Sequence, residues 1–315
     1  MIRNARIFKT ELPSSAAALE EDLAQLPFEE IRPGEIKRQG FVPHYASGHL
    51  TAPFDGGYAF TLRTDERIIP PSVVTQLLEK AEARHREIHG RGFRRVEKQE
   101  EREGIIHELA KTALPKTRYT HAYYHVVSGY LIVDTAGRKP AEEVAGRLLQ
   151  VREAIKTTTL HVSVVRGLTA KLQQELGELQ DIDDLLAQPF GPFSLGDCVK
   201  LKRQGDAAET VTYSNVEIHQ EPQIVDQLRR GFRVAELRLH LYENLSFKLC
   251  EDFSLKAFSW PDNELSEADE LAAEEDPMVA WQADALLQVA GIVRIADNLV
   301  SLLEVKDEES PEEAA

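Results

Sequence analysis

The sequence predicts an α+β protein with several mostly antiparallel sheets and packed helices. Residues 2–9 and 57–63 alternate apolar with polar or small side chains, which is the period of half-buried strands. Other segments repeat apolar residues at helical spacing, and 42% of all residues are hydrophobic, ample for a buried core. We find no repeat with a fixed period, so solenoid and propeller folds are not expected.

A projecting helical hairpin is predicted over residues 72–118. Ser72 directly follows two prolines and is a suitable N-cap for the first helix, which Gly90-Arg91-Gly92 interrupts. A second, charge-rich helix is expected from about Arg94 to Pro115, whose ring and missing N–H disfavour continuation. Neither helix has a wide apolar stripe near the turn, so we expect this hairpin to extend away from the core.

The remaining elements follow the same two periods. Further helices are predicted at 14–26, 140–155, 168–179 and 277–303, and further strands at 120–127, 130–134, 160–165, 193–203, 210–218, 233–241 and 244–250. This order predicts three units besides the hairpin: an N-terminal α+β core at 1–71 and 119–165, a second α+β unit at 166–261, and an acidic linker, amphipathic helix and acidic tail at 262–315.

Charge is distributed unevenly along the chain. The formal net charge is -16, but residues 262–315 hold 16 acids against two basic residues, so residues 1–261 are nearly neutral at -2. Within them, residues 79–118 carry 11 Lys/Arg and 8 Glu. The two cysteines, Cys198 and Cys250, lie far apart, and the N-terminus lacks the pattern of a signal peptide. We therefore expect a cytoplasmic protein without a disulfide framework and without membrane association.

Motifs for catalysis are weak. No Walker-type loop, dinucleotide-binding glycine motif or nucleophile elbow is present. The pairs His85/His89 and His121/His125 have a spacing used by zinc sites, but the first pair lacks the usual glutamate and the second falls in a predicted strand. We therefore expect no metal and no cofactor. A hydrolase with an acidic metal site, for example at Asp181-Ile-Asp-Asp184, remains an alternative.

The basic segment offers the best candidate site. Cations surround the glycine-rich break of the hairpin, where phosphate groups can reach them. They are Arg84, Arg86, Arg91, Arg94, Arg95 and Lys98. Phe93 is the only aromatic residue there, so contact with the backbone of duplex DNA is favoured over base stacking. A charged face that only increases solubility is the alternative.

Short motifs spread over nearly the whole chain resemble the RdgC family. In the family's order they are Gly40–Pro43, Asp65–Val74, Ile105–Leu109, Gly129–Asp134, Phe193–Asp197 and, as the longest match, Leu245–Lys256. The resemblance implies a horseshoe-shaped subunit, two of which close into a ring around double-stranded DNA. It also implies binding with little sequence preference, modulation of RecA-dependent recombination, RecA as a further partner, a nucleoid location and no enzymatic activity.

The same resemblance suggests particular site residues. Arg91 matches a basic position that faces the hole of the ring, and Leu114 matches an apolar interface plug. DNA contacts are therefore expected from Arg91, Arg94, Arg95, Lys98, Lys111 and Lys116. Val216-Glu217 replaces a Lys-Gln pair of the family, so one DNA contact is lost there or an acid is introduced. The alternative function is an acidic protein-interaction module, or DNA mimic, that acts on recombination proteins without binding DNA.

Overall fold

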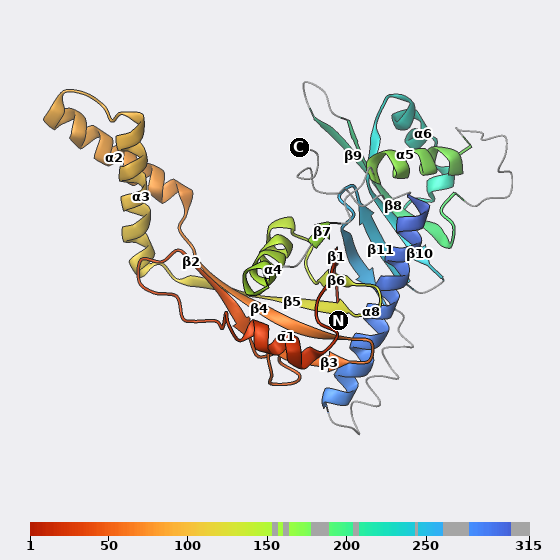
Figure 1. Ribbon diagram of the computed structural model, residues 1–315. Helices are drawn as coiled ribbons and strands as arrows, with labels where there is room; N and C mark the ends of the chain where they lie inside the picture. Colours follow the sequence, from red (N-terminus) through yellow and green to blue (C-terminus); the bar gives the residue numbers. More distant parts are fainter. Residues whose placement is uncertain are drawn as a thin grey trace, which may run out of the picture.

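Two antiparallel sheets and a helical arm make up the fold of the computed structural model (Figure 1). The structure describes residues 1–152, 157–159, 164–177, 189–203, 208–242, 245–260 and 277–303. The predicted α+β class, the mostly antiparallel sheets and the projecting helical hairpin are confirmed.

The first sheet has seven strands in the order β2-β4-β5-β6-β1-β7, with β3 also paired to β4. They are β1 (Arg6–Thr10), β2 (Lys37–Val42), β3 (Thr51–Phe54), β4 (Gly57–Arg67), β5 (Pro115–His125), β6 (Tyr130–Val133) and β7 (Thr157–Thr159). Alternate residues of β4 and β5 point to opposite faces, as their period of two requires. Helices α1 (Ala16–Leu23) and α4 (Arg138–Val151) bury one face, where Leu19 and Leu148 belong to the same core as Phe60.

The second sheet has five strands in the order β12-β11-β10-β8-β9. They are β8 (Phe193–Arg203), β9 (Glu209–Ser214), β10 (Arg233–Leu241), β11 (Leu245–Cys250) and β12 (Leu255–Ser259). Helices α5 (Val164–Glu175) and α6 (Pro222–Arg229) pack on the face that carries Leu201 and Leu237, and the 3-10 turn η1 (Ile218–Gln220) precedes α6. No helix of the described residues covers the opposite face of the sheet.

Helix α8 (Pro277–Leu302) ties the two sheets together (Figure 1). Near its start the Gln282 amide donates a hydrogen bond to the carbonyl oxygen of Pro53 in β3, and near its end the Tyr130 hydroxyl of β6 contacts Asp297 at 2.9 Å. By length and composition α8 could cross a membrane, but the same properties suit a core helix, and its residues Ile292 and Leu299 are fully buried between the sheets.

The first residues of the chain also join the two sheets. Ala5 and Leu255 of β12 exchange two backbone hydrogen bonds, of 2.7 and 2.9 Å. The backbone N–H of Ile2 donates to the side-chain oxygen of Gln288 in α8 at 2.7 Å. The N-terminus therefore lies at the junction of both sheets and α8.

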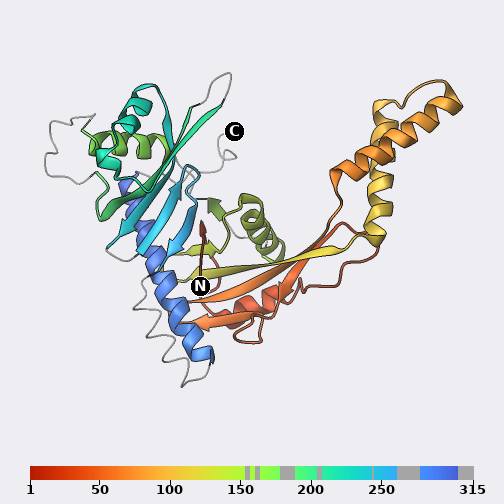
Figure 2. The same ribbon diagram turned by 180° about the vertical axis from the view of Figure 1, so that it is seen from behind.

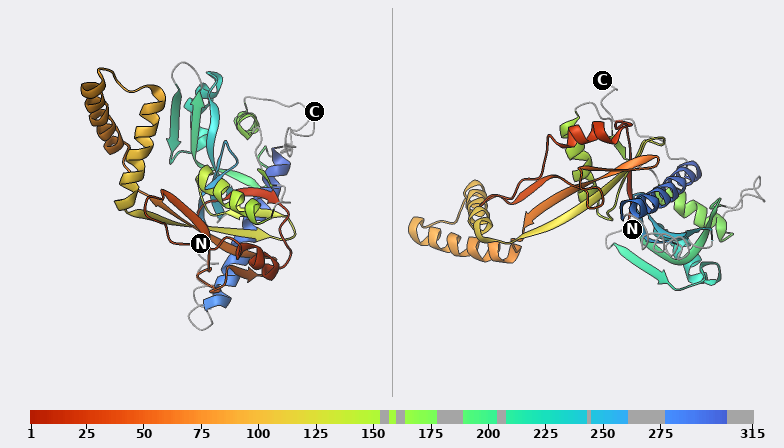
Figure 3. Two further views of the ribbon diagram at one scale, coloured as in Figure 1. Left: turned by 60° about the vertical axis from the view of Figure 1, so that its left-hand side comes forward. Right: turned by 90° about the horizontal axis from the view of Figure 1, so that it is seen from below.

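The arm and the second sheet rise from opposite ends of the first sheet. Helices α2 (Pro71–His89) and α3 (Arg95–Thr112) form the arm at one end, while the second sheet and α6 stand at the other (Figures 1 and 2). The view from below shows the same separation (Figure 3). The chain therefore has an open, horseshoe-like outline.

Several sequence predictions need correction. Helix α2 begins at Pro71, so Ser72 lies inside its first turn and is not the N-cap. Val164 begins α5 rather than ending a strand, and Ile218 lies in η1 rather than in β9. The short elements β2, β3, β12 and α6 were not predicted. The predicted acidic linker and tail lie outside the described residues, as do residues 160–163.

Candidate nucleic-acid interface

The arm is shaped by local sequence signals at its turn. Gly90 ends α2 in the left-handed conformation, with φ of 69°, which glycine adopts without the steric cost of a side chain. The Glu97 carboxylate accepts a hydrogen bond of 2.8 Å from the backbone N–H of Arg94 and so caps the start of α3. These two signals place the basic residues 91–98 at the tip of the arm.

The structure separates the six predicted DNA contacts into two groups. Arg91, Arg94, Arg95 and Lys98 lie together at the tip, whereas Lys111 is at the far end of α3 and Lys116 is in β5. Lys111 lies sixteen positions after Arg95, which corresponds to about 24 Å along the helix. The six cations therefore cannot all contact one phosphate group.

Acidic residues engage half of the tip cations. Both terminal guanidinium nitrogens of Arg91, Nη1 and Nη2, donate to the Glu97 carboxylate at 2.7 Å, and Lys98 contacts Glu82 at 2.9 Å. The hydrogen bonds that Glu97 accepts from the Arg91 side chain and from the backbone N–H of Arg94 lower the pKa of Glu97 to about 2. Arg94 and Arg95 have no acidic partner among the described residues. They are therefore the cations most available to a phosphate.

The two histidine pairs of the sequence do not form a metal site among the described residues, and those at the tip pack against neighbouring rings. The ring of His85 lies 4.4 Å, between centroids, from both His89 and Phe93. His121 and His125 lie in β5, as predicted, and His121 contacts the Thr61 hydroxyl at 3.0 Å. In the part of the chain that the structure describes, no three His, Cys, Asp or Glu side chains gather as a metal site. Residues 181–184, the acidic metal site considered above, lie outside that part.

The base of the arm is apolar and exposed. Leu114, the predicted interface residue, has 79% of its surface exposed, and Ile68 beside it is 58% exposed. The backbone N–H of Ile68 donates to the Leu114 carbonyl at 3.1 Å, which fixes the two residues together. Lys111 contacts Glu108 at 2.5 Å, while Lys116 lies opposite Glu66 in the β4–β5 pair.

Val216 and Glu217 lie between β9 and η1. The backbone N–H of Val216 donates to the Asp197 carbonyl at 3.2 Å, and Glu217 is exposed at the start of η1, where its carboxylate accepts a hydrogen bond from the Gln220 amide. An exposed carboxylate at this point repels phosphate rather than binding it.

One basic group was missed by the sequence analysis. Lys200, Lys202 and Arg233 lie together on the uncovered face of the second sheet. The alternation of lysine with Val199 and Leu201 indicated a strand with one charged face, but it did not indicate which strand brings the third cation.

The fold and the arm define a class of protein: an α+β protein in which one long helix joins two antiparallel sheets and a basic helical arm extends from one of them. A family model described as "Putative exonuclease, RdgC" matches residues 1–306. The chain is 28% identical to the recombination-associated protein RdgC of Neisseria meningitidis serogroup C, over 94% of both chains.

Two further relatives carry the same name. The chain is 28% identical to the protein from Laribacter hongkongensis, over 91% of this chain and 92% of the relative, and 25% identical to that from Herminiimonas arsenicoxydans, over 96% and 97%. The chain belongs to the RdgC family, whose members are named for recombination. The family description names an exonuclease, whereas the relatives' names do not include an activity.

Proposed function

We propose that this protein is a non-enzymatic, homodimeric ring that binds double-stranded DNA without sequence preference and modulates RecA-dependent recombination at the nucleoid. The observation that carries the proposal is the projecting arm, whose tip presents Arg94 and Arg95 without acidic partners among the described residues. Charge of this kind, remote from the core, recognises the phosphate backbone rather than base edges.

Ring closure is supported by the horseshoe-like outline and by the apolar base of the arm. Leu114 is almost fully exposed, and burial against a second copy removes apolar surface from water. A ring needs few phosphate contacts in each subunit, because two linked subunits multiply weak contacts. This explains how a protein with a net charge of -16 can retain a polyanion.

A salt titration of duplex binding tests the DNA contacts. Replacing Arg91, Arg94 and Arg95 by Gln is expected to weaken binding and to reduce the slope of log affinity against log salt by roughly 0.9 for each lost phosphate contact. Arg294→Gln, on α8, removes one exposed charge outside the arm and is expected to leave the slope unchanged. An unchanged slope in the triple variant would show that the tip of the arm does not contact DNA.

Native mass spectrometry tests the dimer. Leu114→Glu places a charge in the proposed contact and is expected to shift the dimer to monomer. Val127→Glu is the matched control, because Val127 is 87% exposed in a turn of the first sheet. A wild-type monomer would contradict the ring.

Two further assays distinguish the other candidate functions. Absence of duplex retention with preserved binding to RecA would favour the protein-interaction module, which is supported by the Arg91–Glu97 and Lys98–Glu82 pairs that occupy tip cations. Release of nucleotides from end-labelled DNA in the presence of Mg²⁺ would favour the exonuclease named in the family description.

A further inference from the structure

The uncovered face of the second sheet is strongly basic. Because α5, α6 and α8 bury the opposite face, this face receives the alternate residues of β8, β10, β11 and β12. Its cations are Lys200, Lys202, Arg233, Arg238, Lys248 and Lys256. They span four neighbouring strands, or roughly 15 Å at about 4.8 Å between strands.

The strand register places like charges next to one another. Lys202 lies opposite Arg233, and Lys248 lies opposite both Arg238 and Lys256. Like charges directly opposite each other on neighbouring strands destabilise a sheet. Three such pairs on one face need compensating negative charge, from acidic side chains of the protein or from a bound anion.

Acidic side chains on this face compensate the charge only in part. Glu251 contacts Lys202 at 2.8 Å, and Glu236 contacts Lys248 at 3.3 Å. Asp197 approaches Arg238, and Glu236 also approaches Lys256. Lys200 lies opposite Glu236 in the β8–β10 register, but neither Lys200 nor Arg233 forms an ion pair among the residues that the structure describes. These two cations are therefore the least compensated on this face.

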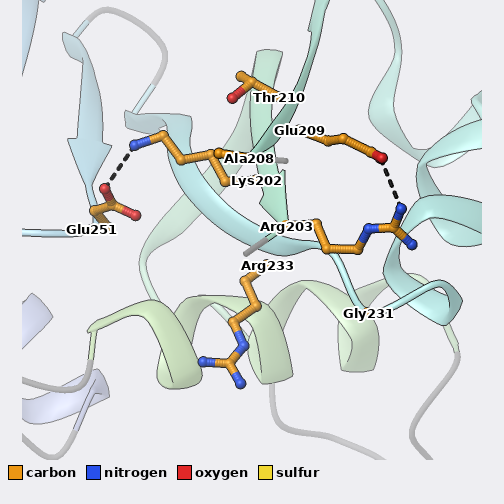
Figure 4. Close-up of a pocket in the computed structure, with 8 residues that line it drawn as sticks. All are labelled: Lys202, Arg203, Ala208, Glu209, Thr210, Gly231, Arg233 and Glu251. Atoms are coloured by element: carbon orange, nitrogen blue, oxygen red, sulfur yellow. Dashed lines mark hydrogen bonds and ion pairs between the residues drawn. The ribbon is translucent and has the colours of Figure 1, made fainter. Parts of the chain in front are cut away.

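A cavity of about 650 Å³ opens at one end of this face (Figure 4). Lys202, Arg203 and Arg233 line it together with the hydroxyl-bearing Thr210. Figure 4 shows the Arg233 side chain directed away from both ion pairs, Lys202–Glu251 and Arg203–Glu209. The guanidinium group has donors suited to the oxygens of a phosphate, and Thr210 adds a hydroxyl donor.

We propose that this face is a second DNA-binding surface, in which the cavity at Arg233 holds one backbone phosphate and Lys200 holds a neighbouring one. The inference rests on the proposed function, because it takes its occupant from there, but it concerns residues outside the arm. A backbone of repeated phosphates fits cations that are spread over four strands. A single small anion accounts only for those at the cavity.

The variant Lys200→Gln/Arg233→Gln tests the proposal. Neither residue forms an ion pair in the described part of the chain, and Glu236, opposite Lys200, keeps Lys248 and Lys256, so the double change leaves no carboxylate newly unpaired. In a salt titration of duplex binding by the full chain, we expect weaker binding and a slope reduced by roughly 1.8, for two lost contacts. Lys171→Gln/Arg294→Gln removes the same charge from α5 and α8 and is expected to keep the wild-type slope.

The outcomes separate this inference from the proposed function. If the wild-type protein does not bind duplex, the proposed function fails and the second surface fails with it. If the wild type binds and Arg94→Gln/Arg95→Gln reduces the slope while Lys200→Gln/Arg233→Gln does not, only the second surface is refuted. A calorimetric titration with pyrophosphate completes the test: binding that the face variant abolishes, with an unchanged DNA slope, would identify a small-phosphate site and overturn the inference.

Discussion

Low pH is expected to destabilise the folded protein through the buried side chain of His44. The His44 ring is fully buried between the first sheet and α8, and its centroid lies 4.8 Å from the Trp281 ring. Its Nδ1 accepts a hydrogen bond of 3.3 Å from the backbone N–H of Ala46, which leaves the proton of the neutral ring on Nε2. Nε2 is buried without a partner among the described residues. Burial, and then the charge of nearby His121, lowers the pKa of His44 to about 4.

The sign of the effect follows from this lowered pKa. The folded protein keeps His44 neutral while the unfolded chain, with an ordinary pKa of 6.5, takes up a proton. The contribution of His44 to the free energy of unfolding is therefore fully present above pH 6.5 and is lost as the pH drops toward 4. The full difference corresponds to roughly 3 kcal/mol, of which about 2 kcal/mol is lost by pH 5.

Urea unfolding followed by circular dichroism at several pH values measures this loss. His44→Asn keeps an acceptor for the Ala46 N–H but cannot be protonated, so the free energy of unfolding should fall by about 2 kcal/mol less between pH 8 and pH 5 than in the wild type. The variant should also be less stable at pH 8, because ring packing against Trp281 is lost. His49→Asn is the control, since His49 lies in the same loop with its side chain 74% exposed beside Glu20. If His44→Asn has the same pH dependence as the wild type, burial of a neutral His44 is refuted.

Three further predictions concern the arm and the first sheet. If the ion pair with Glu97 keeps Arg91 from DNA, Glu97→Gln should steepen the salt slope of duplex binding by roughly 0.9; a slope that neither Glu97→Gln nor Arg91→Gln changes would show that Arg91 does not reach DNA. Gly40→Ala should be strongly destabilising in urea unfolding, because a Cβ there would lie 2.3 Å from the backbone of a neighbouring segment, whereas Gly146→Ala in α4, with open space around it, should stabilise by up to about 1 kcal/mol. Amides of α2 and α3 should exchange hydrogen faster than those of β4 and β5, because each arm helix buries only one residue; equal protection would contradict this.

The sequence predicted the arm well because its limits are local. Proline before α2, glycine after it and proline after α3 act on the backbone where they stand, whatever the rest of the fold does. The cluster at the tip followed directly, because Arg91, Arg94, Arg95 and Lys98 lie within eight residues of one another.

Elements that depend on distant partners were harder to predict. Strand β3 contains Pro53, and β2 contains Gly40, so neither has a clear strand composition, and each is defined by its pairing with β4. The basic face of the second sheet also depends on pairing between strands that are distant in the sequence. Lys202 and Arg233 are thirty-one positions apart in the sequence, and only the β8–β10 register makes them neighbours. A charge count over a short window cannot detect such a pair.

The hydrogen bond between Ile2 and Gln288 joins residues that are 286 positions apart. During synthesis on the ribosome, the N-terminal residues emerge first but must wait for α8, almost the last part of the chain, before they reach their final neighbours. Assembly of the junction is therefore a late event, and contacts so distant in sequence form slowly. Truncation from the C-terminal end should consequently expose apolar surface at the opposite end of the chain.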